Sequence, residues 1–114
     1  MTVTEMTAVM DALFINRVQN LPPEALAEVF DRLTWCLDDN GSALDAVRES
    51  WLRSDDRARV EIVLAMSESF PFQSAAEMSE VLGQISRKWP DLRERCEDLI
   101  VRRADIERVG ETEA

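Results

Sequence analysis

The chain has 114 residues, 46% of them hydrophobic, so it is long and apolar enough for one domain of ordinary size with a real core. Its formal net charge of -10 opposes direct binding to nucleic acids or anionic membranes, whose phosphate groups require clustered positive charge. The two cysteines, Cys36 and Cys96, stand far apart in apolar surroundings, which favours reduced, buried thiols over a disulfide framework.

The composition predicts an all-α fold, because glycine is rare, helix-forming residues are frequent, and no strong hairpin dipeptide lies between alternating runs. Thr2 and Glu5 have the spacing of a capping box for a first helix that runs to about Asn20. This segment contains acidic residues and no preceding basic residue, which is unlike a signal peptide. No apolar run reaches the length of about 18 residues that spans a membrane, and we expect a cytoplasmic protein. The predicted buried positions are Met6, Met10, Leu13, Phe14 and Val18.

A second helix is predicted over residues 23–39. Pro23 suits its first position, because proline lacks an N–H that would be unpaired there. Asn40 or Gly41 can adopt the left-handed conformation that ends a helix. The predicted core stripe of this helix consists of Leu26, Val29, Phe30, Leu33 and Leu37.

Two shorter helices are expected next. One starts at Ser42 with Asp45, and its core positions are Leu44, Val47 and Trp51. The other starts at residues 54–56 and ends before Pro71. Within it, residues 59–66 alternate apolar and charged side chains as a strand would. A lone strand has no sheet partner in this chain, so we predict a buried helix with a strand as the alternative.

Two further helices complete the predicted fold. Ser74 and Glu77 have capping-box spacing before a helix with core positions Met78, Val81, Leu82, Ile85 and Trp89. Pro90 begins the last helix, whose predicted inward positions are Leu92, Cys96, Leu99, Ile100 and Ile106. The expectation is therefore one compact all-α domain over residues 1–109, orthogonal or bundle-like, with five to six helices. Residues 110–114 are predicted to be a flexible acidic tail.

The residues that usually carry catalysis are scarce. The chain has no histidine, no tyrosine and one lysine, Lys88, which removes the commonest general base and most Schiff-base chemistry. Nucleotide-binding and hydrolase motifs are absent. The stretch CLDDNGSALDAV resembles a calcium loop in length, but Cys36 and Val47 stand where carboxylates are essential. We therefore expect neither an enzyme nor a metal or cofactor site.

The second predicted helix has an acidic side with a tryptophan at its centre. At about 100° per residue, Trp35 falls among carboxylates and opposite the predicted core stripe. The predicted partner-binding face consists of Trp35 and five carboxylates, Glu24, Glu28, Asp31, Asp38 and Asp39. An exposed indole ringed by carboxylates is typical of a binding site for a basic protein. The alternative is that a neighbouring helix covers Trp35.

Two further features bear on this partner-binding hypothesis. Phe72 is a second candidate for exposure, and the alternative is that it covers a helix junction. Asp38 and Asp39 are expected at a helix C-terminus, where negative charge is unfavourable, which favours a role in a contact.

The functional hypothesis is a small acidic protein that binds and regulates or inhibits a partner with a basic surface. In size and charge it is similar to phage inhibitors of nucleic-acid machinery, such as anti-CRISPR proteins, and to immunity proteins and antitoxins. Twelve arginines against one lysine are typical of a GC-rich bacterial or phage genome. The alternative hypothesis is a structural or adaptor domain that acts as a homodimer, with its charge serving solubility.

Overall fold

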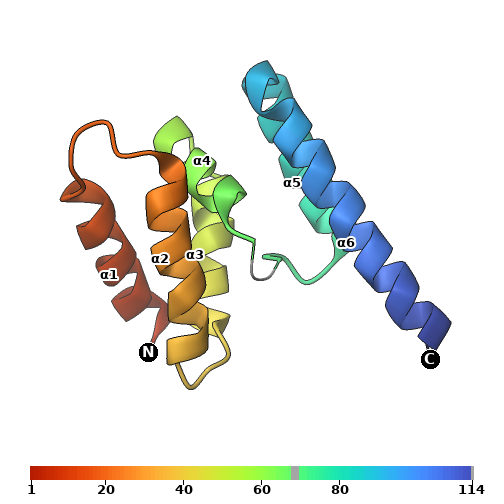
Figure 1. Ribbon diagram of the computed structural model, residues 1–114, viewed down its shortest axis with the longest axis horizontal. Helices are drawn as coiled ribbons and strands as arrows, with labels where there is room; N and C mark the ends of the chain where they lie inside the picture. The colour runs from red at the N-terminus through yellow and green to blue at the C-terminus, as the bar shows by residue number, and fades with distance from the viewer. Residues whose placement is uncertain (68–69, 114) are drawn as a thin grey trace. The chain divides into compact units, whose positions relative to one another are not determined.

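The computed structural model describes residues 1–67 and 70–113, with side chains up to Arg108, and every regular element in them is helical (Figure 1). This confirms the predicted all-α fold. The helices are α1 (Val3–Ile15), α2 (Pro23–Cys36), α3 (Ser42–Leu52), α4 (Arg57–Ala65), α5 (Ala75–Lys88), the 3₁₀ helix η1 (Pro90–Leu92) and α6 (Arg93–Glu113).

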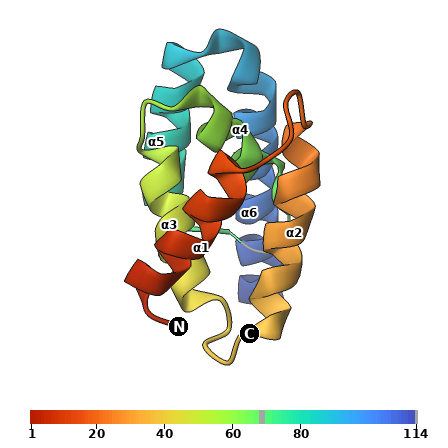
Figure 2. The same cartoon turned by 90° about the vertical axis from the view of Figure 1, so that its left-hand side faces the viewer.

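The chain divides into two compact units, Met1–Pro71 and Phe72–Ala114. In the first unit α1 packs against α3, α3 against α4, and α4 against α2 (Figure 2). The second unit is the antiparallel pair of α5 and α6, joined through η1. The prediction of one domain over residues 1–109 stays a prediction.

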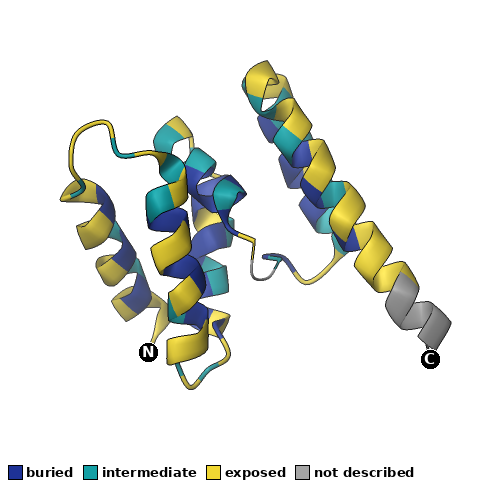
Figure 3. Ribbon diagram, in the orientation of Figure 1, coloured by how far each residue is buried: buried dark blue, intermediate teal, exposed yellow. Residues whose placement is uncertain are grey.

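Three aromatic rings form the centre of the first unit. Trp51 meets Phe14 edge-on at 5.6 Å and Phe30 at 5.9 Å between ring centroids, an arrangement that adds roughly 1 kcal/mol per pair to the burial of the rings. All four helices of this unit contribute further buried residues, coloured dark blue in Figure 3. They include Met6, Met10, Leu26, Leu44, Val47, Val60 and Val63.

Helix α1 begins as predicted and ends earlier. Thr2 and Glu5 form the full capping box. The helix stops at Ile15 because polar side chains take up its last carbonyls: the Asn16 amide donates to Ala12 O at 2.7 Å, and Arg17 donates to Phe14 O at 2.7 Å. Val18 lies beyond this end and Leu13 lies inside the helix, and both residues, predicted to be buried, are exposed.

The segment 59–66 lies in α4 and is a helix, so the strand alternative is wrong. The Asp56 carboxylate accepts hydrogen bonds from the N–H groups of Ala58 and Arg59, which starts the helix. The helix ends at Ala65, five residues before the predicted stop, because Met66 adopts extended backbone angles.

The second unit follows the predicted pattern along most of its length. Ser74 caps α5 through the Glu77 N–H at 3.1 Å, and the stripe from Met78 to Ile85 is buried. It faces Cys96 and Leu99 of α6, which are also buried. Ile106, predicted to face inward, is exposed. α6 continues to Glu113, into the segment predicted to be a tail, and Ala114 lies outside the described residues.

Gly41 is the position at which backbone geometry is most demanding. Its φ is +81°, and a Cβ added there would lie 2.8 Å from Thr34 Cγ2. We expect Gly41→Ala to lower the free energy of unfolding by about 2 kcal/mol, because a left-handed conformation alone costs a residue with a Cβ about 1–2 kcal/mol. Urea unfolding followed by circular dichroism measures this.

Gly83→Ala is the matched control. Gly83 lies inside α5, where an added Cβ would meet only Arg87 Nη1, at 3.9 Å. That substitution should raise stability by about 0.5–1 kcal/mol. Adding Thr34→Ser to Gly41→Ala should restore part of the loss, since it removes Cγ2. Unchanged stability in Gly41→Ala would contradict the described loop.

Candidate functional site

Helix α2 presents Trp35 to solvent, with 71% of its surface exposed. This supports the exposed interpretation of Trp35 over coverage by a neighbouring helix. Glu24 and Glu28 are also exposed and lie within about 40° of Trp35 around the helix. The three side chains span roughly 16 Å along α2, given a rise of about 1.5 Å per residue.

The buried side of α2 differs from the predicted core stripe. With a helical step of about 100° per residue, the centre of the buried side lies roughly 75° around the helix from the predicted one. Val29 and Cys36 are therefore exposed, while Leu33 and Leu37 are partly exposed. The exposure of Cys36 contradicts the prediction that both cysteines are buried. The buried residues are Leu26, Ala27, Phe30, Asp31 and Thr34.

Asp31 was predicted on the partner-binding face, and this prediction is wrong. The residue is 9% exposed, and its two carboxylate oxygens accept from the Ser67 N–H at 3.2 and 3.3 Å. Its negative charge also stabilises the positive form of Arg48, which is 2% exposed. Asp31 therefore ties α2 to α3 and to the chain that follows α4.

Arg48 is the residue that sequence reasoning missed. Its guanidinium donates to Asp45 Oδ1 at 3.1 Å, and burial lowers the pKa of Arg48 while the nearby charges of Asp45 and Asp31 oppose that shift. The signal was present in the spacing: Arg48 lies four residues after Leu44 and three before Trp51, inside the apolar stripe of α3.

Glu28 is exposed and paired within its own helix. Arg32 Nη2 lies 3.1 Å from Glu28 Oε1, one turn away, and both side chains are largely exposed. Such pairs contribute only a few tenths of a kcal/mol, so a partner could replace Arg32 at small cost.

Asp39 holds the loop between α2 and α3 instead of standing at an unfavourable helix end. α2 ends at Cys36, and the Asp39 carboxylate accepts from the N–H of Ala43 at 3.1 Å and of Gly41 at 2.9 Å. These hydrogen bonds, that from Ala43 first, lower the pKa of the Asp39 carboxyl. Asp39 thus caps the start of α3, and the predicted electrostatic conflict is absent.

The remaining loop carboxylate, Asp38, points to solvent on a fixed backbone. Asn40 and Gly41 both have positive φ, 58° and 81°, as predicted, but they lie in the loop before α3 and do not end α2, which stops at Cys36. With Asp39 holding Gly41 and Ala43, the loop conformation is specified from within. We define the Trp35 surface as the exposed residues Glu24, Glu28, Trp35 and Asp38.

Phe72 does not belong to an exposed surface. It is 6% exposed and has a φ of +73°, so the prediction that it is exposed is wrong. Its burial agrees with the alternative that the ring serves packing.

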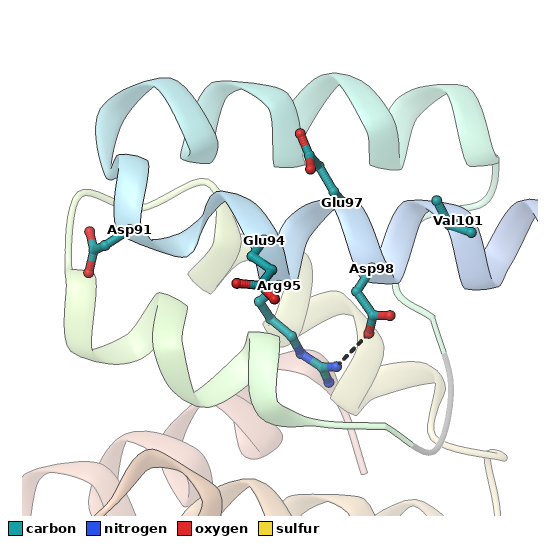
Figure 4. Close-up of a pocket in the computed structure, with 6 residues that line it drawn as sticks. All are labelled: Asp91, Glu94, Arg95, Glu97, Asp98 and Val101. Carbon is teal, nitrogen blue, oxygen red and sulfur yellow. Dashed lines mark hydrogen bonds and ion pairs between the residues drawn. The ribbon is translucent and has the colours of Figure 1, made fainter.

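The rest of the described residues form no second surface that combines an exposed aromatic ring with neighbouring carboxylates. A shallow depression along α6 is lined by residues 91–101 of η1 and α6, and Arg95 pairs there with Asp98 at 3.0 Å (Figure 4). No three His, Cys, Asp or Glu side chains in the described part gather to hold a metal ion.

Burial raises the pKa of the Cys96 thiol, which keeps it protonated. No described helix combines the length and apolar character needed to cross a bilayer.

No family model, curated protein or solved structure matches this chain.

Substitution of Asp31 should lower stability much more than substitution of Glu28, although both are carboxylates of α2. Asp31→Ala leaves the Ser67 N–H without its acceptor and Arg48 with one anion fewer, so we expect a loss of about 3 kcal/mol in unfolding free energy. Glu28→Ala should change it by less than about 0.5 kcal/mol. Chemical denaturation of both variants measures the difference, and equal losses would contradict the burial of Asp31.

The capping role of Asp39 predicts a pH dependence. Because its folded pKa is depressed, the stabilisation is fully present above the unfolded value of 3.8 and is lost as pH falls through the folded value. The melting temperature of Asp39→Asn should therefore lie below that of the wild type at pH 6, and the gap should narrow below pH 3.8. Asp38→Asn, one residue away and exposed, is the control. A gap that stays constant with pH would contradict the cap.

Proposed function

We propose that the chain is a small acidic interaction protein that binds a protein with a basic surface and thereby regulates or inhibits it. A nucleic-acid-processing machine is the class of partner that fits best, because such proteins carry basic surfaces. The observation that carries the proposal is the 71% exposure of Trp35 on the same side of α2 as Glu24 and Glu28.

An exposed indole supports a binding role on energetic grounds. Tryptophan contributes a large contact area with few rotatable bonds, which is why it is enriched among the residues that dominate interface energies. Its backbone lies in a helix followed by an internally hydrogen-bonded loop, so the conformational cost of binding there falls mainly on the side chain.

The charge of the first unit supports a basic partner. Residues 1–71 contain thirteen acidic and six basic residues. Such an excess attracts a positively charged protein over a distance of about 10 Å at 0.1 M salt and speeds association. We further propose that the protein acts in the cytoplasm and without catalysis. The scarcity of the residues that most often carry catalysis, with no histidine and one lysine, supports the second part.

A homodimeric adaptor is the second candidate, favoured by a separate observation. Val101 and Ile106 are both more than half exposed on α6. An apolar contact between two copies through α6 would cover them.

Affinity capture on the immobilised protein tests the proposed function. From a nuclease-treated lysate of the organism that carries the gene, the wild type should retain a basic protein that elutes as salt rises. Trp35→Ala should weaken retention by about thirtyfold, the effect of removing a residue worth about 2 kcal/mol. Glu24→Gln with Glu28→Gln should shift elution to lower salt.

Two control variants make chemically similar changes at exposed residues outside the Trp35 surface. Ile15→Ala removes an equally exposed apolar side chain, and Glu80→Gln neutralises an exposed carboxylate of α5. Neither should alter retention. Capture that is indifferent to Trp35→Ala would refute this surface, and sedimentation showing a dimer with no captured protein would favour the adaptor.

A further inference from the structure

The first unit itself shows how this chain holds an arginine against an aromatic ring. The Arg59 guanidinium carbon lies 4.3 Å from the centre of the Phe14 ring and 5.3 Å from that of Trp51. Its two terminal nitrogens pair with Asp56 at 2.6 Å and Asp11 at 3.3 Å. A ring face and carboxylates on either side thus hold one guanidinium, which combines cation–π and charge-assisted hydrogen bonding.

The Trp35 surface presents the same chemical components to solvent. Trp35 offers an indole, the best ring for a cation, and Asp38 follows it on the fixed loop. The carboxylates of Asp31 and Asp39 are already engaged by backbone N–H groups, and Glu28 is shared with Arg32. The Asp38 side chain is exposed, so a partner can reach its carboxylate.

We propose that the Trp35 surface recognises an arginine side chain of its protein partner, with the guanidinium stacked on the Trp35 indole and donating to the Asp38 carboxylate. This rests on the proposed function, and it specifies the chemistry of the partner. Binding is non-covalent and requires no other group.

Arginine fits this combination better than lysine for two reasons. Its planar guanidinium can stack on an indole while its N–H groups still reach a carboxylate in the ring plane. It is also more weakly hydrated than an ammonium group, so less hydration is lost when it settles on the ring. A lysine ammonium can also lie over an indole, as Lys88 does over Trp89 at 4.8 Å, but it lacks the planar fork that stacks on a ring and donates to a carboxylate at the same time.

The test uses two synthetic peptides of equal charge, acetylated and amidated, with three arginines or three lysines separated by glycines. Each is titrated into the ¹⁵N-labelled full-length protein while the three indole N–H resonances are followed. The Trp35 resonance is assigned by its loss in Trp35→Phe, whose folding is checked by melting. Trp51 is buried and Trp89 half-buried, so they serve as internal references.

We expect the Trp35 resonance to shift with the arginine peptide at about two- to fivefold lower concentration than with the lysine peptide, because only the planar guanidinium stacks on the ring and donates to a carboxylate at once. Asp38→Asn should weaken arginine binding by about the same factor, and the matched carboxylate change Glu80→Gln should not. The inference is supported if the arginine peptide binds more tightly than the lysine peptide and if Asp38→Asn weakens that binding.

Equal shifts with both peptides, no shift with either, or a shift indifferent to Asp38→Asn would overturn it. The proposed function is judged separately by protein capture and its dependence on Trp35→Ala. If the basic protein is still captured but the two peptides bind equally, the proposed function stands and only the arginine recognition is refuted.

Discussion

The buried guanidinium of Arg48 constrains the charged residues near it in the first unit. Arg48 is 2% exposed, and a buried positive charge is tolerated only where anions and hydrogen-bond acceptors compensate for lost hydration. Asp45 supplies an ion pair within α3, and Asp31 adds a smaller contribution from its charge on α2. With Asp31 facing inward, Val29 of α2 lies outside the core and Thr34 lies inside it.

The same rotation defines the candidate binding surface. Turning Asp31 inward leaves Glu24, Glu28 and Trp35 on the exposed side. Thr34, now buried, lies against Gly41, which accepts this close contact because it has no Cβ. The loop is then completed by Asp39, whose carboxylate holds Gly41 and Ala43. One internal charge therefore influences which carboxylates remain outside and how firmly the neighbouring loop is held.

The sequence predicted those features that depend on near neighbours in the chain. The Thr2–Glu5 capping box, the Asp56 start of α4, the left-handed residues at 40–41 and the α5 stripe all follow from local spacing, and all are present. The buried side of α2 includes Asp31, whose charge acts on Arg48 one helix further along the chain. A periodic pattern treats an aspartate as exposed unless a buried cation is known. For this reason the exposure of Trp35 could be proposed from sequence, whereas the burial of Asp31 could not.

The role of Asp39 shows a related limit. A helix predicted to continue through residues 38 and 39 places both carboxylates at its negative end. The helix ends at Cys36, and the following loop turns Asp39 toward the first N–H groups of α3. A shift of three residues in a helix boundary thus converts a predicted electrostatic conflict into a cap, and helix ends are where sequence patterns are least exact.

The Trp35 surface is too small to form a whole interface, and the charges around it indicate where a partner would extend. A tryptophan side chain covers about 150–250 Å², whereas each side of a standard interface covers about 800 Å². The rest of the contact must come from neighbouring parts of the first unit. Residues 37–45 contain three aspartates and no basic residue, whereas residues 53–59 mix three arginines with two aspartates. A basic partner centred on Trp35 would therefore extend over the α2–α3 loop and the start of α3, where its charge meets no opposing arginine.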